Sequence, residues 1–191
     1  MTETRDEIEQ GVVLLPIARA AIARALNVPH MADESATWLT GHGACFVTLT
    51  QSGELRGCIG SLQAHRSLLE DVKSNAVSAA LRDPRFAPLS AEEFDITTVE
   101  VSLLSPSQEM QVRDEADALA QLRPHVDGVI FEYGHYRSTF LPQVWESLAR
   151  PRDFLAMLRR KAGLPDDFWS EDVRLSRYTV TKWSEKEYQH G

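Results

Sequence analysis

Cysteine is scarce in this sequence, and long apolar runs are absent from it. Two cysteines in 191 residues are too few for the disulfide framework of a small secreted domain. No apolar stretch approaches the roughly 20 residues that a membrane-spanning helix needs. The first seven residues are acidic and polar, which is unlike a secretory signal. We therefore expect a cytoplasmic protein without a membrane segment.

Excess positive charge is also lacking. The chain has 20 Lys and Arg against 28 Asp and Glu, a net charge of −8, which argues against general nucleic-acid binding because phosphate contacts need clustered cations. A local anion site remains compatible with this balance. One group of cations falls within a single stretch, but acidic residues dilute it, and we interpret it as a solvated face of mixed charge. The group is Arg56, His65, Arg66, Lys73, Arg82 and Arg85, interspersed with Glu70, Asp71 and Asp83.

Metal and phosphate-binding motifs are missing as well. No cluster of His, Cys, Asp or Glu has the spacing of metal ligands. Gly57 and Gly60 lie inside a predicted strand, whereas a phosphate loop places its glycines between a strand and a helix. We therefore expect no metal and no cofactor.

What is present is an ordinary globular composition, 43% hydrophobic and 25% charged. Apolar spacing predicts helices over residues 7–26, 67–82, 114–122 and 153–161, with Pro16 either kinking the first helix or marking its start. Alternation predicts hairpins at 44–62 and 128–141 and strands at 95–104 and 173–183. Residues 184–191 are expected to be a frayed tail.

The order hairpin, helix, strand thus occurs at 44–104 and again at 128–183. We predict an α+β fold, mainly antiparallel with helices on one side, built as one domain of two unequal lobes. The lobes are expected at about 7–112 and 113–183. A duplicated β-β-α-β unit is compatible with this order, and it would give equivalent places to the hairpin strands carrying Cys58 and Gln143.

The chain is organised around residues 55–62, LRGCIGSL, in the second strand of the first hairpin. Glycine inside a strand usually marks a bulge or a close backbone approach. Alternation puts Arg56, Cys58 and Gly60 on one face, with the guanidinium and the thiol roughly 6–7 Å apart along the strand. This arrangement predicts an accessible, electropositive thiol with Gly60 clearing space beside it. The alternative is a buried Cys58, with Gly57 and Gly60 only bending the strand.

The turn of this hairpin is expected at Ser52-Gly53. Cys58 would then lie opposite Val47, and Cys45 opposite Gly60, so that the two thiols become diagonal neighbours. A redox pair is possible in that register, although structural disulfides are rare in the cytosol.

The sequence resembles the AMMECR family, known in bacteria and archaea as AmmeMemoRadiSam system protein A, over residues 14–183. The matching motifs keep their order along the chain. They are LRGCIG at 55–60, DPRF at 83–86, VEVSLL at 99–104, DGV at 127–129, TFLPQV at 139–144 and KAGLP at 161–165. The family name implies a pathway shared with a Memo-like, dioxygenase-related protein and a radical-SAM protein. It does not specify a reaction.

The resemblance adds Glu100 and Gln143 to the candidate site. Alternation places Glu100 on a polar strand face, away from the predicted core. Gln143 cannot act as a base, which puts a catalytic role at that position in doubt. The Asp83-Pro84-Arg85 motif either ends a helix with a local salt bridge or anchors a ligand.

Two functions follow from these residues. The first is an enzyme or enzyme component, with catalytic Cys58, Arg56 and Glu100 lining a cleft that takes a small or nucleotide-like ligand. Gly57, Gly60, Asp83, Arg85 and Gln143 would form its binding surface. The second is a non-catalytic module that presents the same surface to the Memo-like or radical-SAM protein. The lack of an obvious base favours the second, because the histidines lie at loops and hairpin edges; two glycines beside a thiol favour the first.

Overall fold

The computed structural model describes residues 5–188; residues 1–4 and 189–191, and the side chains of Arg5 and Ile8, lie outside that description. It confirms the α+β fold. Its helices are α1 (Arg5–Ala25), α2 (Leu68–Leu81), α3 (Glu115–Gln121), α4 (Pro151–Ala162) and α5 (Glu185–Tyr188), with 3₁₀ turns η1 (Thr37–Thr40) and η2 (Pro142–Glu146). Its strands are β1 (Ala44–Gln51), β2 (Glu54–Gly60), β3 (Thr98–Leu104), β4 (Gln108–Glu109), β5 (Gly128–Tyr133), β6 (Tyr136–Phe140), β7 (Arg174–Tyr178) and β8 (Val180–Ser184).

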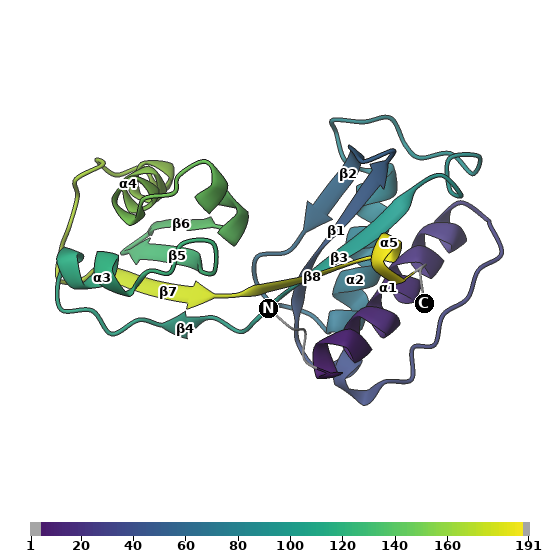
Figure 1. Ribbon diagram of the computed structural model, residues 1–191, viewed down its shortest axis with the longest axis horizontal. Helices are drawn as coiled ribbons and strands as arrows, with labels where there is room; N and C mark the ends of the chain where they lie inside the picture. Colours follow the sequence, from purple (N-terminus) through teal and green to yellow (C-terminus); the bar gives the residue numbers. More distant parts are fainter. Residues whose placement is uncertain (1–4, 189–191) are drawn as a thin grey trace. The chain divides into compact units, whose positions relative to one another are not determined.

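The chain divides into two compact units, each built on one four-stranded sheet (Figure 1). The first unit contains the chain up to Leu104 and again from Thr181 onward, with strand order β2-β1-β3-β8. The second contains residues 105–180, with strand order β4-β7-β5-β6. The first boundary therefore falls after Leu104 rather than near residue 112, and residues 181–188 return to the first unit.

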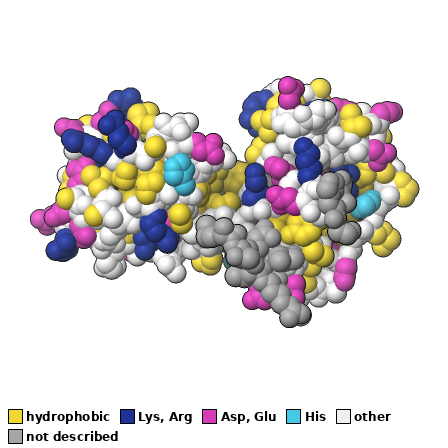
Figure 2. Space-filling model, in the orientation of Figure 1, with side chains coloured by type: hydrophobic (Ala, Val, Ile, Leu, Met, Phe, Trp, Pro, Cys, Tyr) yellow, Lys and Arg dark blue, Asp and Glu magenta, His cyan; other side chains and the backbone are white. Residues whose placement is uncertain are grey.

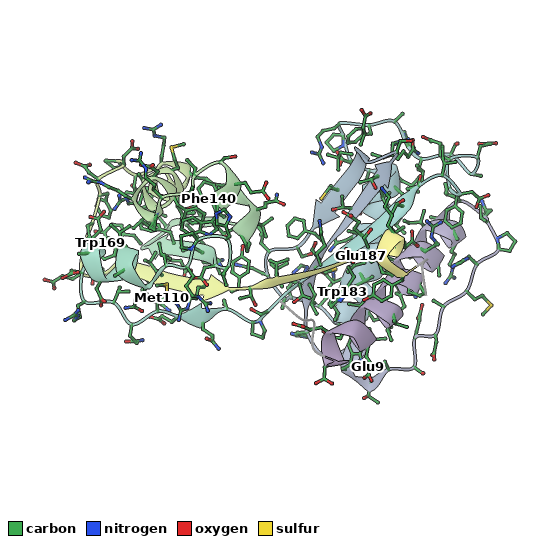
Figure 3. All side chains as sticks on the ribbon, in the orientation of Figure 1. Glu9, Met110, Phe140, Trp169, Trp183 and Glu187 are labelled. Carbon is green, nitrogen blue, oxygen red and sulfur yellow. The ribbon has the colours of Figure 1, made fainter. Side chains whose placement is uncertain are left out.

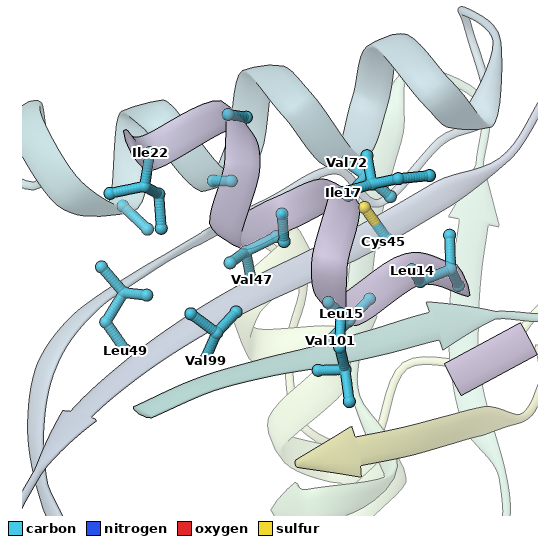
Figure 4. Packing of buried hydrophobic residues seen from close by; sticks show 14 of the residues in the cluster. Leu14, Leu15, Ile17, Ile22, Cys45, Val47, Leu49, Val72, Val99 and Val101 are labelled. Carbon is cyan, nitrogen blue, oxygen red and sulfur yellow. The ribbon is translucent and has the colours of Figure 1, made fainter. Parts of the chain in front are cut away.

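In the first unit, α1 and α2 pack against one face of the sheet. Alternation along β1 turns Cys45, Val47 and Leu49 toward these helices, and all three are fully buried (Figure 4). The opposite face of β1 carries Phe46 and Thr48, which are only half-buried. This sheet therefore has an apolar, helix-covered face and a more polar outer face.

The helix α1 runs without interruption through Pro16, so the alternative that it starts near this proline is wrong. Proline removes one N–H from the helix and crowds the carbonyl four residues earlier. Pro16 and Val12, the residue four positions earlier, are both exposed. Water can therefore reach the backbone group that proline leaves without a partner. None of the helices in the described part of the chain is long and apolar enough to cross a membrane.

The helix α2 begins as the sequence predicted. The Ser67 side chain accepts a hydrogen bond from the Glu70 N–H, and the Glu70 carboxylate accepts one from the Ser67 N–H. This reciprocal pair is a capping box, which satisfies backbone donors that the first turn leaves free. The helix ends at Leu81, just before the Asp83-Pro84 motif.

The second unit packs α4 over its own sheet, around Phe131, Trp145 and Phe154. The rings of Trp145 and Phe154 stack with centroids 3.7 Å apart. Gly163 ends α4 with φ +96°, a left-handed conformation that favours glycine. Phe140 and Met110, labelled in Figure 3, belong to the same unit, where Phe140 packs edge-on against Phe154.

The two units share the predicted order of elements. In each, the strand after the helix pairs antiparallel with the first strand of the hairpin, β3 with β1 and β7 with β5. The duplicated shape is therefore present at the level of topology. Gln143 is not on the equivalent hairpin strand, however, because β6 ends at Phe140 and Gln143 lies in the 3₁₀ turn that follows.

The C-terminal region departs from the prediction. Residues 173–183 were expected to form one strand, but they form β7 in the second sheet and β8 in the first. The following residues are not frayed as far as they are described. Ser184 is buried, and the Glu185 carboxylate accepts hydrogen bonds from Arg19 of α1 and from the Val99 N–H. Trp183 and Glu187 lie in this region (Figure 3).

Candidate functional site

The pairing of β1 with β2 contains a β-bulge that sets the geometry around Cys58. Leu55 opposes Thr50 and Gly57 opposes Leu49, so Arg56 is an extra residue without a partner on β1. The turn lies at Ser52-Gly53 as predicted.

Beyond the bulge, however, every predicted pair is wrong by one position. Cys58 opposes Thr48, not Val47, and Gly60 opposes Phe46, not Cys45.

This shift places the two cysteines on opposite faces of the sheet. Cys45 points to the helices and is fully buried, whereas Cys58 is half-buried and shares the outer face with Thr48. Burial raises the pKa of the Cys45 thiol far above its ordinary value, which keeps it protonated. The hypothesis of a Cys45–Cys58 redox pair is therefore wrong.

The two glycines of β2 serve different close contacts. A Cβ on Gly57 would lie 2.1 Å from the carbonyl oxygen of Ala79, so Gly57 lets the strand approach the backbone of α2. A Cβ on Gly60 would lie 2.2 Å from the ring of Phe46. The space above Gly60 is thus occupied by a cross-strand aromatic ring, and it is not left open beside the sulfur.

Asp83 and Arg85 hold the free edge of β2 at Cys58. The Asp83 carboxylate accepts a hydrogen bond from the Cys58 N–H at 3.0 Å, and Arg85 Nη2 donates to the Cys58 carbonyl at 3.3 Å. Arg85 also donates to Asp83 at 2.7 and 3.0 Å. At this edge, two side chains therefore satisfy the backbone N–H and carbonyl that a neighbouring strand would otherwise pair with. Asp83 is buried, and its pKa is held well below the ordinary range, chiefly by the Arg85 hydrogen bond and next by the Cys58 N–H.

Arg56 forms its hydrogen bonds with residues other than Cys58. Its guanidinium donates two hydrogen bonds to Glu93, at 3.0 and 3.1 Å, and one to the Ala87 carbonyl. The Arg56 hydrogen bonds lower the pKa of Glu93 to about 2. The guanidinium that contacts Cys58 is that of Arg85, through the Cys58 carbonyl, and the hydrogen bond to Asp83 is the main cause that raises the pKa of Arg85.

Polar residues form a row across the outer face of the first sheet. The Cys58 Sγ lies 3.2 Å from the Thr48 Oγ1, and Thr48 directly opposes Glu100 on β3. The Glu100 carboxylate lies 4.0 Å from the Lys182 ammonium of β8. With two strand spacings between them, the backbones of Cys58 and Glu100 are roughly 10 Å apart. Glu100 therefore belongs to the same sheet face as the thiol, as predicted for its polar strand position.

A buried polar network anchors the start of β1. The Asp71 carboxylate is completely buried and accepts hydrogen bonds from the Cys45 N–H, the Ser61 hydroxyl, the Arg66 guanidinium and the Asn75 amide. The interpretation of this stretch as a solvated mixed face is therefore wrong for Asp71 and for Asp83. Both carboxylates are internal groups with charged partners, as burial of a charge requires.

Other predicted residues lie apart from this arrangement. Gln143 is exposed in the second unit, within η2. Among the described residues, no group of three or more His, Cys, Asp or Glu is placed to hold a metal ion. On the surface shown in Figure 2, basic and acidic side chains are mixed over each unit.

Sequence reasoning missed Thr48 and Glu93. The predicted register pairs Cys58 with Val47 instead of Thr48, because it lacks the bulge at Arg56. Glu93 did have a local signal, since Ser90 and Glu93 are spaced as a capping box and bond each other's backbone N–H groups. Its pairing with Arg56, 37 positions away, had none.

Chemically, the arrangement offers one half-buried thiol with a hydroxyl and a guanidinium beside it. The thiolate is the nucleophilic form of cysteine. The fold and this site define an α+β protein with a thiol displayed on a clamped edge strand.

The AMMECR1 family model matches residues 15–183, and the chain therefore belongs to the AMMECR1 family. Protein MJ0810 of Methanocaldococcus jannaschii is 37% identical over 189 residues, covering 94% of this chain and 92% of that protein. A protein of Thermotoga maritima is 39% identical over 140 residues, covering 72% and 75%. The crystal structure of the uncharacterized protein PH0010 from Pyrococcus horikoshii is similar with a TM-score of 0.74 and 33% identity, covering 92% and 91% of the two chains.

Proposed function

We propose that this protein works in one pathway with a Memo-like, dioxygenase-related protein and a radical-SAM protein, and that its working surface surrounds Cys58. The observation that carries this proposal is that the backbone of Cys58 is held by two side chains. Its N–H and carbonyl are both held, by Asp83 and Arg85, while its side chain stays half-exposed on the outer face. A residue whose backbone is fixed and whose thiol remains accessible is suited to present that thiol to a ligand.

In this proposal the protein is an enzyme component, and Cys58 is its reactive thiol. Arg85 is bonded to the Cys58 carbonyl, the Thr48 hydroxyl lies beside the thiol, and Glu100 lies one strand beyond Thr48 as a polar group for the ligand. Arg56 supports the site indirectly by joining β2 to Glu93. The ligand would be small or nucleotide-like.

A non-catalytic interaction module is the second candidate. The helices α1 and α2 cover only the face of the sheet that carries Cys45 and Val47. No histidine is bonded to Cys58 in the described part of the chain, and a covalent mechanism needs a base. The same outer face would then be the surface that contacts the Memo-like or radical-SAM protein.

Alkylation kinetics separate the two candidates. For the enzyme component, iodoacetamide modifies Cys58 faster than free cysteine near neutral pH. Arg85→Gln and Thr48→Val each slow the reaction several-fold, and Arg85→Lys restores part of the rate. Arg150→Gln serves as the control with an unchanged rate, because Arg150 is an exposed arginine of the second unit that pairs with Asp153. A wild-type rate no higher than that of free cysteine excludes an activated thiolate. Retention of both partner proteins by wild type and by Cys58→Ser in co-purification would then identify the interaction module.

A further inference from the structure

The second unit contains a pocket of about 360 Å³ that is separate from the Cys58 surface and is lined in part by two arginines, Arg123 and Arg177. Both guanidiniums are partly exposed, with 53% and 32% of their side chains accessible. Tyr178, which is buried, lines the same pocket. In a chain with a net charge of −8, two arginines lining one hollow are a local exception.

The net charge of the two arginines depends on their neighbour Asp127, which is completely buried. Its carboxylate accepts two hydrogen bonds from the Arg123 guanidinium, at 2.6 and 3.0 Å, and one from the Arg123 N–H at 2.9 Å. Arg123 alone therefore satisfies and neutralises Asp127. The Arg177 guanidinium lies 3.9 Å from this carboxylate, and its hydrogen bond in the described chain is to the Gln121 carbonyl. One positive charge is left over, and it belongs to Arg177.

The walls of the pocket are preformed. A Cβ on Gly128 would lie 2.4 Å from the ring of Tyr178, so glycine at this position lets the ring lie against β5. The Tyr178 hydroxyl is bonded to Thr139 and to the Phe140 carbonyl, which fixes the ring. Ser105 and Thr179 close another side: the Thr179 N–H donates to the Ser105 hydroxyl at 2.8 Å, and the Ser105 N–H donates to the Thr179 carbonyl at 2.9 Å. The Asp127-Gly128 motif therefore builds this pocket: Asp127 orients one arginine, and Gly128 admits the aromatic wall.

We propose that this pocket binds the oxyanion group of a small molecule, a carboxylate or a phosphate. The contacts of Arg123 with Asp127 use Nε and Nη2, and those of Arg177 use Nη1, so both guanidiniums retain N–H groups for a ligand. Two planar guanidiniums suit the paired oxygens of such a group. Asp127 does not line the pocket, and its negative charge is covered by Arg123. The site is independent of Cys58 and of the proposed pathway role.

Calorimetric titration of the whole protein at low ionic strength tests this proposal with three probes: inorganic phosphate, phenyl phosphate and benzoate. The expected result is saturable one-site binding of at least one probe. Phenyl phosphate above benzoate identifies a phosphate site, and the reverse order identifies a carboxylate site. Arg177→Gln weakens binding about tenfold, as loss of one charge-assisted contact predicts. Arg174→Gln is the matched control, because Arg174 lies on the same strand, is paired with Glu109 and does not line the pocket.

Arg177→Gln retains the Arg123–Asp127 pair, so the buried carboxylate keeps its partner in this variant. Arg177→Lys is the second variant; it keeps the charge but loses the planar donor fork, and it is expected to bind with intermediate affinity. Absence of saturable binding for all three probes overturns the proposal. Equal affinities of wild type, Arg177→Gln and Arg177→Lys overturn it as well, because they place the binding elsewhere.

Discussion

Cys58 and Thr48 are direct cross-strand partners, with the thiol sulfur 3.2 Å from the threonine hydroxyl oxygen. This relationship exists because Arg56 is an extra residue in β2. Without the bulge, the alternation of the strand would pair Cys58 with Val47, which faces the buried helices. A single bulged residue therefore decides whether the thiol lies in the core or on the outer face.

The same relationship predicts that the two cysteines do not form a disulfide with each other. Diamide treatment of the native protein is expected to give no intramolecular disulfide, because the thiols lie on opposite faces of one sheet. Ellman's reagent should titrate one thiol in the native state and two in denaturant, since Cys45 is fully buried. Cys58→Ser should lose the native signal, and Cys45→Ala should keep it. A Cys45–Cys58 cross-link found by peptide mass spectrometry would contradict the register.

Gly57→Ala is expected to destabilise the protein by about 1–3 kcal/mol or more, because its Cβ would meet the carbonyl oxygen of Ala79 at 2.1 Å. Backbone atoms of α2 cannot rotate aside as a side chain can. Urea denaturation measures the change. Gly41→Ala is the control: its φ is −67° and its Cβ would find its nearest neighbour at 3.5 Å, so a change within about 0.5 kcal/mol is expected. Equal stability of Gly57→Ala and wild type would show that β2 does not approach α2 closely.

Asp83 is expected to make stability depend on pH in the acid range. Its pKa is lowered in the folded state, so the native protein binds fewer protons than the unfolded chain between the two pKa values. The stabilisation is present above the unfolded-state pKa, about 3.9, and is lost as pH falls below it.

The advantage of wild type over Asp83→Asn should therefore be constant above about pH 5 and shrink as the pH falls from about 5 toward 2 in urea titrations. Asp95→Asn, at an exposed position, is the control and should leave the pH dependence of wild type unchanged. If the stability difference between wild type and Asp83→Asn stayed constant over this range, the clamp on Cys58 would not depend on an ionised Asp83.

Several elements could be predicted because their causes are local. The start of α2 at Ser67 and its end before Asp83-Pro84 each depend on residues within a few positions. The hairpin turn at Ser52-Gly53 is local in the same sense. The sequence also indicates the candidate thiol and the close approach at Gly57, since glycine inside a strand usually marks a bulge or a close contact with another backbone.

The remaining features depend on partners far along the chain. The Asp83 carboxylate bonds the backbone of Cys58, 25 positions earlier, and Glu93 takes Arg56 away from the thiol. The alternation of residues 173–183 predicts a single strand, but pairing in different sheets divides this segment into β7 and β8.

The sequence by itself determined the α+β fold, the helix ends, both hairpins and a thiol at an unusual glycine-flanked position. Only the tertiary structure decided which cation stands near that thiol, which face of the sheet displays it and where Gln143 lies. The physical reason is that periodicity specifies a face only while alternation is unbroken. One bulge reverses that assignment, and hydrogen-bond partners on distant segments then settle which charges meet.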